Sequence, residues 1–537
     1  MSWKDEVDGI EARRQAALGL GGPDAVAAQH AKGRLTVRER VTALLDPDSF
    51  QEQGPIAGHA QKDAAGRLVA FAPANYVLGF GRIDGRPCVV GGEDFTQSGG
   101  SPSPAGLRKS VLAEDLAVRH KLPLIRLLEG GGGSVAPRVP AGNARSEAQP
   151  SEAGSRGSAA PGPVVLDSGN GPPRFLSFAQ AMATAPVVSA ALGAVAGLPA
   201  ARLVASHFSL MARDTAQVLI AGPLLVERAR GITATKEELG GAAVHLRSGV
   251  VDNAAPDEGA VLALVRRFLS YLPTNVWEAA PVTPSDDPAD RAAPELLELV
   301  PRERRKSYKM RRALEAVLDL GSFFELAPEY GRSLITGLAR LRGQPVGAVA
   351  NDPNFYAGAM TAHAAQKLRR FVELCDTFHL PIVSFVDEPG FLIGPDAERD
   401  ATIRHGTAAI FAVMQSSVPW VSVIVRKVFG VAGAAHFGPG GHVLAWPSAE
   451  SGALPLEGGV AVAFRREIEA APDPEAKRRE LEDMLAARRD PYARAEAFAV
   501  SDLIDPRHTR AALCAWLEWI QPGLAQLRGP RSYGPRP

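Results

Sequence analysis

Cysteine is scarce in this chain of 537 residues, and no metal-binding motif accompanies it. The three cysteines, Cys88, Cys375 and Cys514, lie far apart in apolar surroundings, without the paired spacing of metal ligands. Disulfide-rich domains and zinc modules depend on closely spaced cysteines. The sequence therefore predicts three buried thiols in a reducing compartment and no metal site.

Charge of one sign and long apolar runs are also lacking. The 59 basic and 59 acidic residues cancel, so no overall field favours nucleic acid or an anionic membrane. No apolar run is long enough to cross a bilayer, and the charged N-terminus lacks the apolar core of a signal peptide. We expect a soluble, cytoplasmic chain with no nucleic-acid or membrane partner. At roughly 150 residues per domain, its length predicts several domains.

Familiar catalytic motifs are missing as well. The chain has no GxSxG elbow and no GxxxxGK[ST] phosphate loop, and its histidines form no metal-spaced group. The glycines at 130–133 lack the lysine of a phosphate loop, which favours a packing or substrate-approach role. His405 is a candidate general base, although a cap or core partner is the favoured interpretation. The roles of Asp387 and Glu388 are left open, because acid/base chemistry and a part in turn formation or helix capping explain them equally well.

What the sequence does contain is an alternation of helical and strand-like segments. Helices are expected at 3–31 with a break at 19–23, at 37–45, 105–120 and 175–183, from 224 onward, and at 258–271. Strands are expected at 77–83, 88–91, 122–128, 186–192, 217–220 and 421–425, the first two joined by the hairpin turn Asp84-Gly85. Residues 142–173, rich in Gly, Ala, Ser and Pro, indicate a surface insert.

The second half of the chain repeats the first. Three pairs share an offset of 258 residues: Pro87 and Pro345, Lys109 and Lys367, and Pro123 and Pro381. APVVSAALGAVAG aligns with VPWVSVIVRKVFG at an offset of 233, because the first half carries the insert. The repeat predicts two homologous α/β domains, 1–280 and 302–537, joined by a linker at 281–301.

The stretch 421–435, VSVIVRKVFGVAGAA, is the strongest candidate for a binding element. An apolar β-branched run of strand type leads into Arg426-Lys427 and then a turn of small residues, where bare main-chain N–H groups can hold an oxyanion or phosphate. The segment 193–198 is its counterpart in the first half. Two such turns facing one another would suit acyl chemistry in which two carbonyl oxygens develop negative charge.

The chain resembles the carboxyltransferase (β) subunit of biotin-dependent acyl-CoA carboxylases, the group of propionyl-CoA and methylcrotonyl-CoA carboxylases. The resemblance covers most of the chain. It is carried by GRLTVRERVTALLDPDSF, IAGPLLV, KEELGGAAVH, GSFFEL, FVDEPGFLIG, IRHG, VPWVSVIVRKVFG, AWPSAE and FRREI, in the order of the family. It implies two crotonase-like domains in tandem, an acyl-CoA side at 1–280 and a biotin side at 302–537.

The resemblance also implies a reaction, the transfer of CO2 from N1′ of carboxybiotin to the α-carbon of an acyl-CoA. The first turn, Gly197 and Leu198, would hold the thioester oxygen of an enolate. The second, Val431 and Ala432, would hold the ureido oxygen of biotin, and freed biotin would take the α-proton. The remaining expected contacts are Phe429, Gly430, Arg426 and Lys427 for biotin, and Gly131, Gly132, Gly193 and Ala196 for acyl-CoA. For Arg426 and Lys427 a structural ion pair is an equal alternative.

The chain departs from the family at both turns and lacks a biotin-attachment site. Where the family commonly has Gly-Gly in the first turn, this chain has Gly197-Leu198, followed by Pro199, which has no N–H to donate. Gly430-Val431-Ala432 replaces Gly-Gly-Ala. Without a Met-Lys-Met sequence, biotin is expected on a biotin carboxylase/biotin carrier (α) subunit, with the β chains forming a hexamer. The alternatives are a crotonase-type hydratase, isomerase or decarboxylase of acyl-CoA, or a catalytically idle scaffold subunit.

Overall fold

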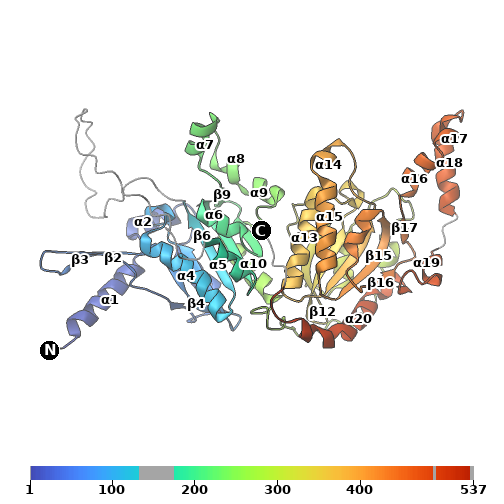
Figure 1. Cartoon of the computed structure of the whole chain (residues 1–537). Helices are drawn as coiled ribbons and strands as arrows, with labels where there is room; N and C mark the ends of the chain where they lie inside the picture. The colour runs from blue at the N-terminus through green and yellow to red at the C-terminus, as the bar shows by residue number, and fades with distance from the viewer. Residues whose placement is uncertain (1, 132–173, 488–490, 532–537) are drawn as a thin grey trace.

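Two eight-stranded mixed sheets lie in tandem, one in each half of the chain (Figure 1). The computed structural model describes residues 2–131, 174–487 and 491–531, so Gly132 and the predicted insert at 142–173 lie outside the described residues. The strand orders are β1-β4-β5-β6-β7-β8-β10 and β11-β12-β13-β14-β15-β16-β18, with β9 beside β7 and β17 beside β15. The predicted pair of homologous α/β, crotonase-like domains is confirmed.

The elements of the first half occur in the following order. They are α1 (Lys4–Leu18), α2 (Pro23–His30), α3 (Val37–Leu44), β1 (Gln51–Glu52), β2 (Gly58–Lys62), β3 (Leu68–Pro73), β4 (Tyr76–Ile83), β5 (Arg86–Glu93), η1 (Ser98–Gly100), α4 (Pro104–His120), β6 (Leu124–Gly130), α5 (Arg174–Met182), β7 (Val187–Ala196), α6 (Leu198–Val204), β8 (Phe208–Ala212), β9 (Gln217–Leu219), α7 (Pro223–Arg230), α8 (Lys236–Gly240), α9 (Ala242–Ser248), β10 (Asn253–Ala255) and α10 (Glu258–Ser270).

The second half follows the same plan. Its elements are α11 (Leu296–Leu299), α12 (Met310–Val317), β11 (Phe324–Leu326), β12 (Leu334–Leu341), β13 (Gln344–Asn351), η2 (Tyr356–Gly358), α13 (Ala362–Thr377), β14 (Ile382–Glu388), α14 (Pro395–Arg399), α15 (Thr402–Gln415), β15 (Trp420–Phe429), η3 (Val431–His436), β16 (His442–Ala445), β17 (Glu450–Gly452), α16 (Leu456–Ala463), α17 (Arg465–Glu469), α18 (Pro474–Ala487), α19 (Ala493–Glu496), β18 (Asp502–Leu503), η4 (Pro506–His508), α20 (Thr509–Leu524) and η5 (Ala525–Leu527).

Local sequence signals account for many of these boundaries. Thr36 and Glu39 form a capping box at the start of α3. Ser103 caps α4, and its counterpart Thr361 caps α13. The central strands β6 and β14 are buried along their whole length, which explains their continuous apolar sequence.

Strand register confirms the internal repeat. Leu124 of β6 lies opposite Val187 of β7, and Ile382 of β14 lies opposite Trp420 of β15. The offset is therefore 258 residues for the first strand of each pair (382 minus 124) and 233 for the second (420 minus 187). Both pairs contain a shift in register before the last paired residue, Gly130 in one half and Glu388 in the other.

Strands β7 and β15 run further than their sequences predict. The predicted strands end at 192 and 425, whereas β7 continues to Ala196 and β15 to Phe429. The extra residues are paired by short strands distant in sequence, because β9 pairs with residues 194–196 and β17 with residues 427–429. Each predicted small-residue turn therefore begins only at the glycine after the strand.

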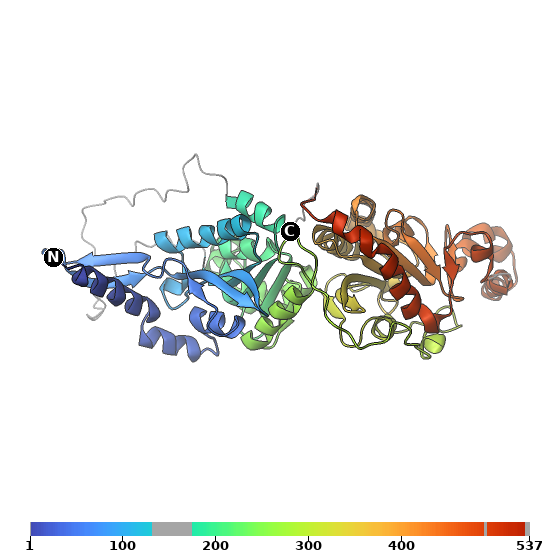
Figure 2. The same cartoon turned by 90° about the horizontal axis from the view of Figure 1, so that it is seen from below.

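The two halves are in direct contact. Arg370 of α13 forms an ion pair with Asp252, and the Tyr271 hydroxyl donates to the main-chain oxygen of Ser322 at 2.5 Å. After α20 the C-terminal segment returns to this boundary, near the middle of the molecule (Figure 2), where the N–H of Gly529 donates to the Val276 oxygen at 2.8 Å. One apolar cluster is continuous across both halves. No helix in the described part of the chain is long and apolar enough to span a membrane.

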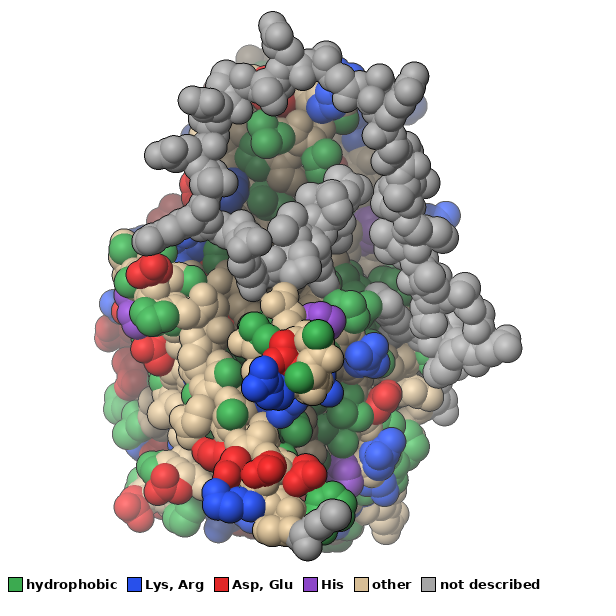
Figure 3. All heavy atoms as spheres, turned by 90° about the vertical axis from the view of Figure 1, so that its left-hand side faces the viewer, with side chains coloured by type: hydrophobic (Ala, Val, Ile, Leu, Met, Phe, Trp, Pro, Cys, Tyr) green, Lys and Arg blue, Asp and Glu red, His purple; other side chains and the backbone are tan. Residues whose placement is uncertain are grey.

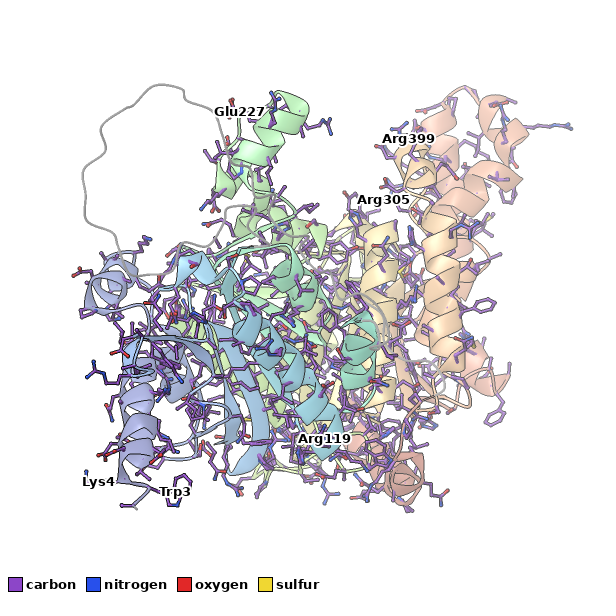
Figure 4. The ribbon with its side chains drawn as sticks, turned by 60° about the vertical axis from the view of Figure 1, so that its left-hand side comes forward. Trp3, Lys4, Arg119, Glu227, Arg305 and Arg399 are labelled. Carbon is purple, nitrogen blue, oxygen red and sulfur yellow. The ribbon has the colours of Figure 1, made fainter. Side chains whose placement is uncertain are left out.

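Two arms rise from the same side of the molecule. One consists of α7 and α8, which follow β9, and the other of α16, α17 and α18, which follow β17 (Figure 1). Glu227 on α7 and Arg399 on α14 lie on this side, opposite Trp3, Lys4 and Arg119 (Figure 4). At the end of the molecule formed by the first half, acidic and basic side chains are intermixed (Figure 3).

Candidate functional site

A glycine with the same unusual backbone conformation follows the central strand of each half. Gly197 after β7 has φ 68° and ψ −129°, and Gly430 after β15 has φ 62° and ψ −163°. Positive φ of this kind strains residues that carry a Cβ. The two glycines are 233 residues apart, the offset of their strands, and both are exposed. The turns predicted as twins are therefore structural equivalents.

Each glycine leads into a short helix whose first main-chain N–H groups have no acceptor within the helix. These helices are α6 in the first half and η3 in the second. The N–H of Gly430 is already used, because it donates to the Gly452 oxygen at 3.1 Å. At the second turn, the helix-start N–H groups are therefore those of Val431 and Ala432, whose role in holding the ureido oxygen stays a prediction.

The first turn has fewer donors than the second. Pro199 occupies the position of Ala432, so of the two equivalent positions that start the helix, Leu198 alone has an N–H to present. The Leu198 side chain packs against a cluster that includes Leu116 and Phe178. By contrast, Val431 is 65% exposed. Of the two side chains that replace glycine in the family pattern, Leu198 is thus partly taken up by the core and Val431 borders the open surface.

The basic residues before the second turn lie within β15. The buried Arg426 guanidinium forms an ion pair with Asp387 at 3.0 Å and donates to the main-chain oxygen of Lys306 at 2.9 Å. The Tyr308 hydroxyl donates to the same carboxylate at 2.9 Å, and the N–H of Lys427 at 3.1 Å. These contacts favour the structural alternative for Arg426, while a biotin contact by Lys427 stays a prediction.

Gly193, predicted to contact acyl-CoA, is buried within β7. A Cβ at this position would lie 2.3 Å from Glu129 Oε1, so the glycine makes room for that carboxylate. Glu129 forms ion pairs with Arg34 at 3.0 Å and Arg40 at 2.6 Å. Its charge is therefore neutralised inside the first half.

The other predicted contacts have varied surroundings. Ala196 lies opposite Leu219 of β9, and Phe429, the residue of the second half at that position, is buried. The N–H of Gly131 donates to the Gly99 oxygen at 3.2 Å, and Gly132 lies outside the described residues. Their roles in ligand binding stay predictions.

His405 lies on α15. Gln366 Nε2 is 3.2 Å from its Nδ1, and both residues line a cavity of about 460 Å³ between the halves. These contacts match the favoured interpretation of His405 as a structural partner. Among the described residues, no three His, Cys, Asp or Glu side chains are arranged to hold a metal ion.

Two buried carboxylic acids near the turns have a raised pKa: sequence reasoning missed Glu93 and left the role of Glu388 open. Glu93, at the end of β5, is fully buried next to Gly130, and burial raises the pKa of its carboxyl group. Glu388 of β14 is also buried, and burial raises its pKa too. The offset of 258 pairs Glu93 with Asn351 and Glu388 with Gly130. Each half therefore buries an acid with a raised pKa at this place, on a different strand, which the repeat register could have revealed.

The two turns belong to different halves and do not meet within one chain. In Figure 1, α13 and α15 stand between α6 and β15.

A family model for the carboxyl transferase domain matches residues 28–146 and 169–525. The chain belongs to this family. The carboxyltransferase subunit of propionyl-CoA carboxylase from Haloferax mediterranei is 35% identical over 528 residues, 97% of each chain. The 12S subunit of methylmalonyl-CoA carboxyltransferase from Propionibacterium freudenreichii subsp. shermanii is 33% identical over 520 residues, 95% of this chain and 93% of that one.

A crystal structure of transcarboxylase 12S has the same fold. It superposes with a TM-score of 0.83 and 30% sequence identity, covering 100% of this chain and 98% of that one. That protein is a hexamer, with methylmalonyl-coenzyme A and methylmalonic acid bound. The resemblance to carboxyltransferase subunits of biotin-dependent acyl-CoA carboxylases is thus confirmed over nearly the whole chain.

Proposed function

We propose that this protein transfers CO2 between carboxybiotin, carried on a partner subunit, and the α-carbon of an acyl-CoA. The observation that carries the proposal is the pair of equivalent turns at Gly197 and Gly430. Each presents main-chain N–H groups at the end of a central strand. Oriented donors of this kind stabilise oxyanions without moving during the reaction.

The first turn would bind the thioester. The N–H of Leu198 would donate to the thioester oxygen, which gains negative charge as the α-carbon loses its proton. The partly buried Leu198 side chain supports this role, since it packs into the core rather than standing free in the turn. Pro199 fixes the backbone that follows.

The second turn would bind biotin. Gly430 and Val431 are exposed, so a ureido ring can reach the main chain, and the N–H groups of Val431 and Ala432 would donate to the ureido oxygen. Carboxybiotin supplies the CO2 and, once freed of it, a base. In the forward direction the N1′–carboxyl bond breaks, a bond from the carboxyl carbon to the α-carbon forms, and the α-proton ends on N1′.

We further infer that each active site combines the first turn of one chain with the second turn of another. The separation of the two turns within a chain supports this arrangement (Figure 1). The hexameric assembly of the related transcarboxylase 12S is consistent with it. The partner bearing biotin would be a biotin carboxylase and carrier (α) subunit.

The alternatives are less well supported. A hydratase or isomerase needs a free carboxylate near the first turn. Glu129, against β7, is held by two arginines, and the pKa of Glu93 is raised by burial. An idle scaffold would not need two exposed turns with the same backbone conformation.

The reverse reaction tests the proposal without the α subunit. The purified chain is mixed with free d-biotin and either malonyl-CoA or methylmalonyl-CoA, and release of acetyl-CoA or propionyl-CoA is measured. We expect release that depends on biotin. Thioester decarboxylation at the same rate without biotin, or water addition to an enoyl-CoA, would favour the hydratase or decarboxylase alternative.

A further inference from the structure

A buried polar cluster lies beneath the second turn. His436, the last residue of η3, is fully buried, with its Nε2 3.3 Å from Glu388 Oε2 and its Nδ1 3.1 Å from Ser384 Oγ. One arrangement of protons satisfies all three groups: the Ser384 hydroxyl donates to Nδ1, and Nε2–H donates to the carboxylate. The cluster therefore connects the helix after the turn to strand β14.

Glu388 is bound from further directions. Asn351 Nδ2 donates to its Oε2 at 3.0 Å, and the N–H groups of Met360 and Gly390 donate to its Oε1 at 3.2 and 3.0 Å. The carboxylate thus joins β13, β14 and η3. A group held by so many donors has little freedom to move.

The main chain of His436 is held as well. Its carbonyl oxygen accepts hydrogen bonds from Trp420 Nε1 at 2.8 Å and from Ser422 Oγ at 2.6 Å. The end of η3 is therefore bound to β15 through its main chain and to β14 through its side chain.

The first half holds its helix through other residues: Arg202 of α6 forms a buried ion pair with Glu114 at 3.0 Å, and neither a histidine nor an acid stands at the two equivalent positions. Leu203 occupies the position of His436, at the offset of 233, and Gly130 that of Glu388, at the offset of 258. Leu203 is fully buried, so an apolar side chain can pack the helix against the sheet at this place. Buried ionisable pairs add little stability over apolar pairs of similar volume. Packing alone therefore does not account for Glu388 and His436.

The helices after the two turns differ in a way that does account for them. The glycine turn of the first half continues into the α-helix α6. Pro199 is the second residue of this helix and restricts its backbone. The turn of the second half continues into a 3-10 helix, whose hydrogen bonds have poorer geometry, with Ala432 in place of the proline. The second turn therefore needs another source of rigidity.

We propose that Glu388 and His436 are positioning residues for the second turn. By holding η3 against β14 they keep the N–H groups of Val431 and Ala432 in one orientation, aimed at the oxygen of the bound biotin. The inference rests on the proposed function and assigns the pair to the biotin side of the reaction. The pair should not affect the first turn or the binding of the thioester.

The test compares wild type with His436→Leu, which carries the residue of the first half. Reverse transfer to d-biotin is measured with the malonyl-type thioester that wild type uses best. We expect kcat/KM for biotin to fall by tenfold or more, because displacing a hydrogen-bond donor by even a fraction of an ångström slows a reaction by about this factor. The KM for the thioester should stay within twofold. Unchanged kinetics toward biotin would overturn the proposal.

Two further variants separate positioning from folding. Glu388→Gln with His436→Leu leaves no unpaired charge, so its melting temperature should recover relative to His436→Leu, while transfer stays impaired. Wild-type transfer by this double variant would overturn the proposal. His379→Leu is the matched control: it removes another buried imidazole of the same half, bonded to the Val276 oxygen at 2.9 Å, and should leave KM for biotin unchanged.

A measurement without substrate keeps this inference distinct from the proposed function. Hydrogen–deuterium exchange of the amides at 431–433 should be faster in His436→Leu than in wild type, whether or not wild type transfers CO2. Equal exchange in both proteins would overturn the positioning role. A wild type that is inactive with every thioester would instead overturn the proposed function.

Discussion

Gly197 and Gly430 lie 233 residues apart and have the same left-handed φ, 68° and 62°. Both follow the last residue of a central strand and precede a short helix. The equivalence extends one residue further, to Leu198 and Val431, and then the chemistry diverges, since Pro199 has no N–H and Ala432 has one. Differences between the halves can therefore be tested by exchanging residues between equivalent positions.

Ala432→Pro removes an N–H donor of the second turn and introduces the residue that the first half has at the equivalent position. Proline already occupies the equivalent position 199, where it is buried, so the backbone can accept the ring. We expect the rate of transfer to fall by about 100- to 1,000-fold, as for loss of an oxyanion donor. The melting temperature should fall as well, because Ala432 is fully buried and the ring adds volume there. Ala432→Gly keeps the N–H and is the control. Equal activity of the two variants would show that the biotin pocket is elsewhere.

Leu198→Ala and Val431→Ala should differ in their effect on stability. Leu198 packs against the core, so its truncation should lower the free energy of unfolding by about 1–2 kcal/mol while transfer continues. Val431 is 65% exposed, so its truncation should leave stability unchanged. Chemical denaturation of both variants checks this. A large loss of stability in Val431→Ala, or none in Leu198→Ala, would contradict the packing described for the turns.

Glu93→Gln tests the buried acid of the first half. The pKa of Glu93 is higher in the folded chain than the usual value of about 4.3, so between those values the folded chain holds the extra proton. Stability then falls as the pH rises through that window. The variant keeps the shape of the protonated acid without titrating. Its melting temperature should therefore exceed that of wild type increasingly as the pH rises above about 4.

The same variant separates transferase from hydratase chemistry. If freed biotin accepts the α-proton, Glu93→Gln should transfer CO2 at close to the wild-type rate. A variant slowed by about 100-fold or more, with the fold intact, would identify Glu93 as a general base and favour the crotonase-type alternative.

Mixing two inactive variants tests whether sites are shared between chains. Leu198→Pro removes the donor of the first turn and Ala432→Pro one donor of the second. When the two chains are co-expressed, about a quarter of sites built between different chains combine two intact turns. Recovery of about a quarter of wild-type transfer is therefore expected. No recovery in a mixed oligomer would place each site within one chain.

Much of this arrangement could be predicted from the sequence. The offsets of 258 and 233 residues predict the duplicated fold, and the strand register confirms both. The glycine turns can be located because their residues are local to a strand end. The predicted lengths of β7 and β15 were wrong, because β9 and β17, which pair with their ends, come from later in the chain.

Side-chain roles were harder to predict, because they depend on distant partners. The sequence left two roles for Arg426, a contact with biotin or a structural ion pair. Its contact with Asp387 on the neighbouring strand favours the ion pair. The sequence likewise left the role of Glu388 undecided between acid/base chemistry and turn formation. Its partner His436 is 48 residues away in the sequence. Neither partner can be identified before β14 and β15 are placed side by side.

Carboxylation of a thioester by the assembled enzyme tests the central claim most directly. The purified chain and its biotin-carrying partner are incubated with ATP, bicarbonate and a panel of acyl-CoAs, and products are identified by mass. We predict that at least one thioester gains CO2 only when both subunits are present, and that Ala432→Pro abolishes most of this gain. Carboxylated biotin on the partner, with every thioester left unchanged, would contradict the account.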